Sequence, residues 1–236
     1  VGYQKTLRSQ GIRCETFNRF HPFLTTLQNN RDHRKIAVID GKIAYTGGIN
    51  LADEYINEKP RFGHWRDCGV RMDGAAAESF TTMFLQMWGL LSRTREPLRD
   101  LIADRDATTP SDGWVQPYTD SPMDKIHVGE RIYSHAITRS QKCLYITTPY
   151  LMVGEEMIAS LKCCAKSGVD VRIFVPGIPD KKVVFFTTRS YYRELLSAGV
   201  KIFEYTPGFI HSKIVVSDDD FCMIGSTNMD FRSFYL

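Results

Sequence analysis

The sequence predicts a layered α/β fold built from two copies of one unit, related by a pseudo-twofold axis. Three segments share one pattern, in which an amphipathic helix is followed by a glycine and then a β-rich run, at Gly11, Gly168 and Gly199. A short motif of histidine, lysine and aspartate also occurs twice, in HRKIAVID and in HSKIVVSD. Helices that alternate with strands of this length are typical of α/β folds.

Local chemistry justifies the individual elements. Glycine just past a helix end adopts the left-handed cap at little cost, so each of the three segments predicts a helix that ends and a strand that follows. Further helices are expected at 124–140 and 181–198, and a further strand at 143–152. A helix over 74–92 places Phe80, Phe84, Met87, Trp88 and Leu91 on one stripe. The main interpretation of this stripe is contact with the core, and membrane contact is the alternative.

The domain boundary is predicted where the composition changes. Residues 93–123 are rich in proline, aspartate and serine, which is typical of a linker. We therefore expect a first repeat over 1–112, with its linker from about residue 93, and a second repeat over 113–236. The second copy has a helix–strand–helix–strand run at 124–175 that the first copy lacks. The first repeat is thus expected to miss its N-terminal part, and the second its C-terminal end.

Composition restricts the class of protein. The net charge is only +3, whereas a dedicated nucleic-acid binder is usually more basic. The six cysteines form no CxxC pair, which favours reduced, mostly buried thiols in a protein that faces the cytoplasm. No signal peptide or membrane-spanning run is apparent, and the start at Val1 suggests a piece of a longer chain.

The repeated motif carries the functional prediction. The first copy places Lys35 two positions and Asp40 seven positions after His33, and the second copy places Lys213 and Asp218 in the same way after His211. Gly48 and Asn50 follow the first copy where Ser226 and Asn228 follow the second. One such motif arises by chance in roughly 1 chain in 50, and two on the order of 1 in 10⁴. The pair therefore indicates one shared site.

These residue types suit the handling of a phosphodiester. Residues at i and i+2 share one face of a strand, so imidazole and ammonium are expected side by side at the start of the buried strands IAVI and IVV. A neutral imidazole can attack phosphorus, and an ammonium can hold a non-bridging oxygen as its charge grows. The amides of Asn50 and Asn228 can donate to the same oxygens.

The aspartates of the motif receive a different prediction. An odd offset along a strand points Asp40 and Asp218 away from their histidines, and both lie where a hairpin turns. We expect framework hydrogen bonds from them. For the carboxylate that orients His33, the best candidate is Asp67, in HWRD, whereas the sequence offers no convincing candidate for His211.

A metal site is the competing interpretation of two histidines and two aspartates. A lysine beside each histidine would repel a divalent cation, and no HExxH or CxxC pattern supports a site. No metal and no other cofactor is therefore expected.

The duplicated motif resembles the phospholipase D superfamily. Five segments, which together span most of the chain, are similar more specifically to bacterial cardiolipin synthases: NNRDHRKIAVIDGKIAYTGGINLADEY, FGHWRDCGVRMDG, YITTPYLM, RSYYRELLSAGVKIFEYTPGFIHSKIVVSDD and IGSTNMDFRSF. This resemblance implies a phospholipase D-like α/β sandwich of two repeats.

The resemblance also implies a mechanism without a metal. His33 would attack the phosphodiester and form a phosphohistidine, and His211 would act as acid and then base. Lys35, Lys213, Asn50 and Asn228, with Gly48 and Ser226 nearby, would bind the phosphoryl oxygens, and Asp40 and Asp218 would complete the two motifs.

The implied reaction joins two phosphatidylglycerol molecules into cardiolipin and releases glycerol. It implies anionic phospholipids and a membrane surface as partners, without nucleic acid. It also implies a location at the cytoplasmic side of a bacterial cell membrane, with an anchor outside this chain. Members of the superfamily usually carry a glutamate shortly after the second GS-x-N, beyond Leu236 here, and that residue could serve His211.

Two alternatives remain at this point. A phospholipase D-type hydrolase or nuclease would use the same chemistry on another substrate or with water as acceptor. A non-catalytic phosphate- or lipid-binding relative would use the same residues without turnover, although both motifs are complete.

Overall fold

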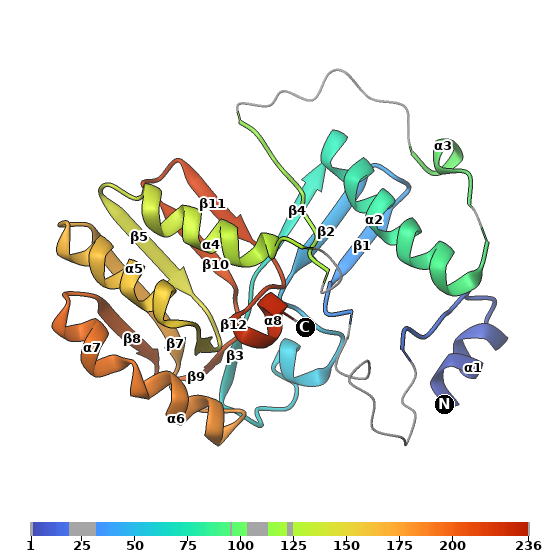
Figure 1. Ribbon diagram of the computed structural model, residues 1–236. Coiled ribbons are helices and arrows are strands. Elements are labelled where there is room, and N and C mark those ends of the chain that lie inside the picture. The colour runs from blue at the N-terminus through green and yellow to red at the C-terminus, as the bar shows by residue number, and fades with distance from the viewer. Residues whose placement is uncertain (1, 19–31, 95, 103–112, 122–124, 236) are drawn as a thin grey trace. The chain divides into compact units, whose positions relative to one another are not determined.

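The computed structural model describes residues 2–18, 32–94, 96–102, 113–121 and 125–235 (Figure 1). The chain forms two compact units, one of Val1–Tyr45 with Arg71–Pro117 and one of Thr46–Val70 with Tyr118–Leu236. The elements up to residue 101 are α1 (Gly2–Ser9), β1 (Ile36–Ile39), β2 (Ile43–Gly47), the 3-10 helix η2 (Asp53–Ile56), β3 (His64–Arg66), β4 (Gly69–Asp73), α2 (Ala75–Ser92) and α3 (Leu98–Leu101). The later elements are α4 (Val128–Arg139), β5 (Cys143–Thr147), β6 (Leu151–Met152), α5 (Glu155–Lys166), β7 (Asp170–Pro176), α6 (Lys182–Ser190), α7 (Tyr192–Ser197), β8 (Lys201–Tyr205), β9 (Gly208–Ile210), β10 (Ile214–Ser217), β11 (Phe221–Ile224), β12 (Met229–Asp230) and α8 (Phe231–Tyr235).

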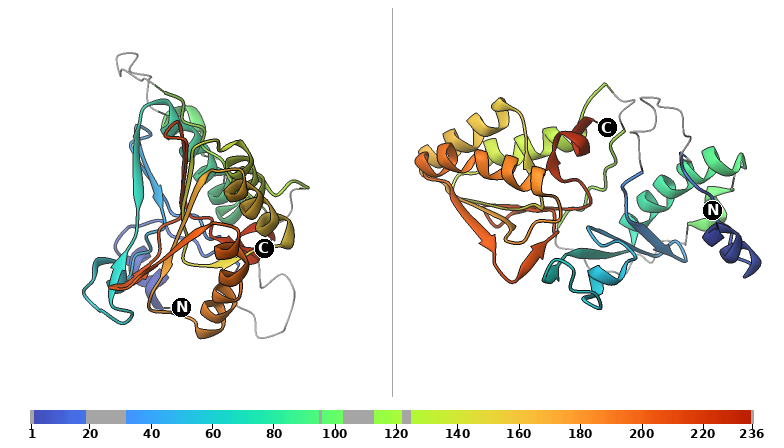
Figure 2. Two further views of the ribbon diagram at one scale, coloured as in Figure 1. Left: turned by 90° about the vertical axis from the view of Figure 1, so that its left-hand side faces the viewer. Right: turned by 90° about the horizontal axis from the view of Figure 1, so that it is seen from below.

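A five-stranded sheet organises the second unit. Its order is β11-β10-β5-β7-β8, with β5, β7 and β8 parallel and β10 antiparallel to both β5 and β11. The α-helices of this unit lie together on one side of the sheet (Figure 2). Alternate residues of β5 and β7 point into the core beneath them, among them Leu144, Ile146 and Ile173, each 0% exposed. The alternation of buried residues is the period that a half-covered sheet imposes.

The glycine-capped helices of the second unit are confirmed. α5 is followed by Gly168, with φ of 94°, and then by β7, and α7 is followed by Gly199, with φ of 97°, and then by β8. In the first unit α1 precedes Gly11, with φ of 82°, as predicted. The strand expected after Gly11 is wrong, because residues 12–17 pair with no described strand.

The other predicted elements form with interruptions. The helix expected at 124–140 is α4. The strand expected at 143–152 is two strands, β5 and β6, separated by a turn in which the Thr148 hydroxyl donates to the carbonyl of Tyr150 over 2.8 Å. The helix expected at 181–198 is likewise two helices, α6 and α7, which meet at Tyr191.

The first unit is built on the sheet β1-β2-β4, with α2 packed against β1. The predicted helix over 74–92 is confirmed as α2, but its predicted stripe is partly wrong. Phe80 is buried, whereas Phe84 is 49% exposed, and the buried face of α2 also includes Ala77, Thr81 and Met83. The prediction that IAVI is a buried strand is also wrong, because β1 lies at the sheet edge and only alternate residues are partly covered.

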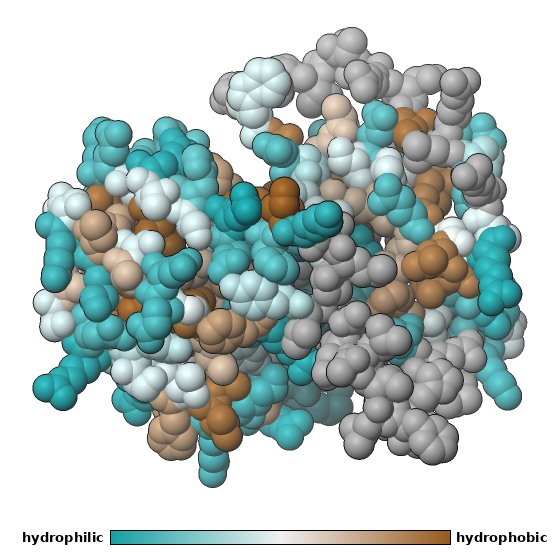
Figure 3. Space-filling model, in the orientation of Figure 1, coloured by the Kyte–Doolittle hydropathy of each residue, from teal (hydrophilic) through white to brown (hydrophobic). Residues whose placement is uncertain are grey.

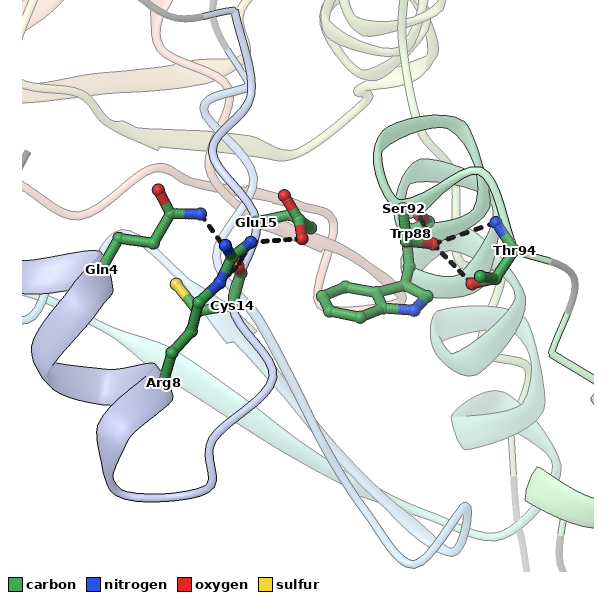
Figure 4. Close-up of polar contacts among 7 residues, drawn as sticks. All are labelled: Gln4, Arg8, Cys14, Glu15, Trp88, Ser92 and Thr94. Atoms are coloured by element: carbon green, nitrogen blue, oxygen red, sulfur yellow. Dashed lines mark hydrogen bonds and ion pairs between the residues drawn. The ribbon is translucent and has the colours of Figure 1, made fainter.

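Polar contacts tie α1 to the segment that follows it (Figure 4). Arg8 donates to the carbonyl of Cys14 over 2.8 Å and pairs with Glu15 over 2.5 Å, while the Gln4 amide donates to the same carbonyl. At the end of α2, the hydroxyls of Ser92 and Thr94 lie 2.7 Å apart. The contacts of Gln4 and Arg8 hold residues 14 and 15 against α1.

Packing divides the chain differently from the predicted repeats. Residues 46–70, which follow the first motif, pack with the second half of the chain. The predicted boundary near residue 112 divides the chain into two copies of one sequence unit, and this division stays a prediction. Part of the predicted linker, 103–112 with residues 95 and 122–124, lies outside the described residues.

All six cysteines are free thiols, as expected, but the prediction that most are buried is wrong. Only Cys164 is buried, and Cys163 and Cys222 are exposed. Among the described residues, no helix combines the length and the apolar character needed to cross a membrane.

Candidate active site

A short parallel ladder brings two distant segments of the second unit together at the site. β3 pairs with β9 in the register His64 to Gly208, Trp65 to Phe209 and Arg66 to Ile210. The close approach requires Gly208, since a Cβ there would lie 2.3 Å from the carbonyl oxygen of His64. The ladder continues by one bond, from the backbone N–H of His211 to the carbonyl of Arg66, over 2.7 Å. The residues that follow the ladder on each strand, Asp67 and His211, therefore meet.

His211 and Asp67 form a buried pair. The Nδ1 atom of His211 lies 2.7 Å from Oδ2 of Asp67, and the two side chains are 7% and 3% exposed. An ionised carboxylate only accepts hydrogen bonds, so Nδ1 carries the proton of this bond in the neutral ring and in the imidazolium alike. Nε2 is then the ring nitrogen that gains or loses a proton as the ring changes charge. The sequence prediction had paired Asp67 with His33 and had found no partner for His211, and the structure corrects both points.

Aromatic rings surround the His211 imidazole. The ring centroids of Tyr55, Trp65 and Phe209 lie 5.3, 5.2 and 5.9 Å from that of His211. These rings limit access of water to the ring and hold its plane, and a low local dielectric strengthens its bond to Asp67. Burial raises the pKa of the Tyr55 hydroxyl, which therefore keeps its proton at neutral pH.

Gly48 makes room for Asp67. A Cβ at this position would lie 2.2 Å from Oδ1 of Asp67, so no other residue fits without displacing the carboxylate. The backbone N–H of Gly48 donates to the carbonyl of Cys68 over 3.1 Å. The Gly48 N–H is therefore already bonded within the protein. What Gly48 contributes here is space for Asp67, a packing role that differs from the phosphate binding predicted for it.

Asn50 also belongs to the surroundings of His211, although it follows the first motif in sequence. Its side-chain amide donates to the hydroxyl of Tyr55, whose ring contacts His211 edge-on. Asn50, Gly48 and Asp67 are thus joined to the second motif within one unit.

Lys213 is 1% exposed, and its ammonium donates to the carbonyl of His211. Lys35 makes the equivalent bond to the carbonyl of His33, over 2.6 Å. In each motif the lysine ammonium is thus held beside the histidine two positions before it. In both motifs the His-x-Lys tripeptide comes just before β1 or β10, and not within the strand as expected.

Asn228 is 6% exposed, and its Nδ2 donates to the hydroxyl of Ser233 over 3.1 Å. Its Oδ1 is buried without a hydrogen-bond partner among the described residues. A half-turn of the amide would let Ser233 donate to Oδ1 and would direct the NH₂ group to the position that Oδ1 now occupies. Asn228 can therefore offer a donor to an oxyanion. Ser226, in the same loop, is partly buried.

The first motif is more open than the second. His33 is exposed and Lys35 is partly buried, whereas their counterparts His211 and Lys213 are buried. His33 and Lys35 belong to the first unit and His211 and Lys213 to the second. A shared site for the two motifs stays a prediction.

The motif aspartates take the turn positions that were expected. Asp40 and Asp218 have φ of 52° and 54°, and each begins the two-residue stretch of positive φ at its hairpin turn. The Asp218 carboxylate accepts backbone N–H bonds from Cys143, Lys142 and Gln141 over 3.0, 2.8 and 2.8 Å. These bonds hold the pKa of Asp218 below its ordinary value. The framework role predicted for Asp218 follows from these contacts.

In the part of the chain that the structure describes, no group of three or more His, Cys, Asp or Glu residues could hold a metal ion. Sequence reasoning missed Tyr55, Trp65 and Phe209 as neighbours of His211. Their one sequence signal is position, since Trp65 stands two residues before Asp67 and Phe209 two before His211.

The chain is similar to known proteins. Residues 133–236 match the family described as "Cardiolipin synthase, PLD-like domain". An uncharacterized protein of Streptococcus mutans is 46% identical over 99% of this chain and 50% of its own length. The cardiolipin synthase of Alkalihalophilus pseudofirmus is 40% identical over 99% of this chain and 47% of its own, and cardiolipin synthase 2 of Bacillus cereus is 40% identical over 99% and 46%.

The chain thus spans about half the length of the curated relatives it matches. Among solved structures, the phospholipase D family member Nuc of Salmonella typhimurium aligns over 45% of this chain and 68% of its own, with 18% identity and a TM-score of 0.37. The chain is thus similar over 99% of its length to proteins named cardiolipin synthase, and its residues 133–236 match the phospholipase D-like domain of that family.

Proposed function

We propose that this chain carries the catalytic residues of a phosphatidyltransferase that joins two phosphatidylglycerol molecules into cardiolipin and releases glycerol. The single observation that supports it most is the buried pair of His211 and Asp67, with the ammonium of Lys213 bonded to the carbonyl of His211. The names of the relatives support the choice of cardiolipin as product.

The His211 ring is set up for proton transfer. With Nδ1 held by Asp67, Nε2 points its lone pair away from the carboxylate and can take a proton from an incoming alcohol. Once protonated, the same nitrogen can give the proton to a departing alcohol, and Asp67 stabilises the imidazolium that forms. We assign the role of acid and base to His211 and the role of nucleophile to His33.

The reaction proceeds in two displacements. In the first, the neutral imidazole of His33 bonds to phosphorus as the P–O bond to glycerol breaks, and His211, which enters this step as an imidazolium paired with Asp67, gives its Nε2 proton to the glycerol oxygen. In the second, His211 takes the proton from the hydroxyl of a second phosphatidylglycerol, whose oxygen bonds to phosphorus as the P–N bond to His33 breaks. Lys35, Lys213, Asn50 and Asn228 stabilise the phosphoryl oxygens in both transition states.

The test is turnover on vesicles of phosphatidylglycerol by the full-length protein, with cardiolipin and phosphatidic acid measured separately. We expect cardiolipin and an equal amount of free glycerol. Phosphatidic acid as the main product would show that water is the acceptor and the protein is a hydrolase. Binding of phosphatidylglycerol without either product would show a non-catalytic relative.

A further inference from the structure

The outer face of α6 exposes large apolar side chains. Val183 and Phe186 are 77% and 65% exposed, and they stand one helical turn apart on the same side of the helix. Ile178, in the loop before α6, is 39% exposed. Figure 3 shows hydrophobic side chains along the lower edge of the second unit, where α6 lies in Figure 1. Apolar side chains gathered in this way mark an interaction surface.

Cations are frequent in α6 and in the residues next to it. Residues 181–193 contain Lys181, Lys182, Arg189 and Arg193 and no acidic residue. Lys181 lies 3.9 Å from Asp180, and Arg189 lies 3.1 Å from Glu204, yet their side chains remain 63% and 49% exposed. A helix that combines exposed apolar side chains with several Lys and Arg residues has the composition of a surface that rests in the headgroup region of an anionic bilayer.

The inner face of α6 leads toward the candidate active site. Val184, Phe185 and Thr188 line a hollow together with Tyr150 and Phe209. The Phe209 ring centroid is 5.9 Å from that of His211. The outer face of α6 is therefore exposed, whereas its inner face lines a hollow beside Phe209, one of the rings around the His211 imidazole.

We propose that the outer face of α6, formed by Val183 and Phe186, docks with the exposed cations of 181–193 on the surface of an anionic phospholipid bilayer. The proposal rests on the phospholipid substrate proposed above. The apolar side chains enter the headgroup region, and the cations attract the anionic lipids. A docked α6 holds the His211 site at the depth of the phosphodiesters, so that a lipid need not leave the bilayer to react.

Fluorescence quenching by brominated lipids tests the contact directly, whether or not other parts of the full-length protein bind the membrane. We would compare Phe186→Trp with the matched control Phe203→Trp, each against the unsubstituted protein to subtract the three native tryptophans. Phe203 is 42% exposed in the same unit, on β8, and points to the sheet face opposite the one where Ile202 packs on the core.

With vesicles of brominated phosphatidylglycerol, we expect quenching of the added fluorescence at position 186 and not at 203. With phosphatidylcholine vesicles, the quenching at 186 should fall. No quenching at 186, or equal quenching at both positions, would overturn the proposal. If the tryptophan at position 186 becomes inaccessible to a soluble quencher when the protein concentration is raised without lipid, the face binds protein instead, and the docking proposal is wrong.

A double variant, Val183→Ser with Phe186→Ser, separates docking from chemistry. Turnover of phosphatidylglycerol in vesicles should fall about 10-fold, because the face no longer binds. Turnover of a water-soluble nitrophenyl phosphodiester should not change. If the double variant keeps both rates, the docking proposal is wrong. If the unsubstituted protein turns over neither substrate but position 186 is still quenched by lipid, the proposed function is wrong and the docking proposal stands.

Discussion

At the scale of single residues, the environment of His211 decides which ring nitrogen bonds to Asp67 and which one exchanges protons. Asp67 accepts from Nδ1 at 2.7 Å, and the surrounding rings of Tyr55, Trp65 and Phe209 keep the pair away from bulk water. Gly48 is required by the same arrangement, because any side chain there would collide with the carboxylate. The His211–Asp67 pair, Gly48 and the three rings thus form one packed group.

Asp67→Asn keeps the shape of the side chain but removes the charge and permits the wrong histidine tautomer. We expect turnover to fall about 10³-fold with KM little changed, because the loss is in the transition state. The pH–rate profile should shift as well, and Asp67→Glu should restore part of the rate. Asp73→Asn, which removes a carboxylate paired with Arg71 on β4, is the control and should leave turnover unchanged. A full-rate Asp67→Asn enzyme would reject the positioning role.

The two histidines should give different chemical phenotypes in the full-length protein. His33→Ala should form no phosphohistidine with any substrate, because the nucleophile is gone. His211→Ala should still form it with an activated leaving group such as a nitrophenolate, and then stall without a base. Acid-labile phosphoryl label on the protein after rapid quench measures this. Label on the first variant but not the second would reverse the assignment.

At the scale of elements, two hairpin turns repeat one construction. β1 and β2 are joined through Asp40, and β10 and β11 through Asp218, and both aspartates adopt positive φ. The Asp218 carboxylate joins its turn to the start of β5 through three backbone N–H groups. The turn thereby anchors the strand that follows Lys213, which explains how an aspartate remote from the chemistry belongs to the motif.

The stability of the second unit should depend on pH through Asp218. Its pKa is lower in the folded state, so its contribution is fully present above the ordinary aspartate value of about 3.9 and is lost as pH falls through the folded value. Asp218→Ala should lower Tm by several degrees at pH 7, and the difference from the unsubstituted protein should shrink near pH 2. Thermal unfolding at both pH values measures it. A difference that is constant with pH would contradict the cause.

At the scale of the whole molecule, the two motifs lie in different compact units, and each histidine has its own surroundings. Catalysis by two displacements on one phosphorus atom requires that both histidines reach it.

We therefore predict that the motifs converge in the full-length protein, with the His33 and His211 rings about 5–8 Å apart around one phosphate. A crystal structure of that protein with a bound tungstate should show the oxyanion in contact with both rings. Motifs on opposite faces of the molecule would exclude a shared site.

Turnover should also persist in excess chelator. Lys35 and Lys213 stand where a metal would otherwise supply positive charge, so the phosphoryl oxygens need no divalent cation. The measurement is the rate of cardiolipin formation with and without chelator. A loss that magnesium or zinc restores would reject this mechanism.

What the sequence by itself determined was local or repeated. Glycine caps at Gly168 and Gly199, turn positions at Asp40 and Asp218 and the duplicated motif all depend on residues close in the chain, where φ preferences and side-chain period act directly. What only the tertiary structure decided was the partner of His211. Asp67 stands 144 residues away, and the two meet because β3 pairs with β9 in a single register, which residue spacing within either segment cannot reveal.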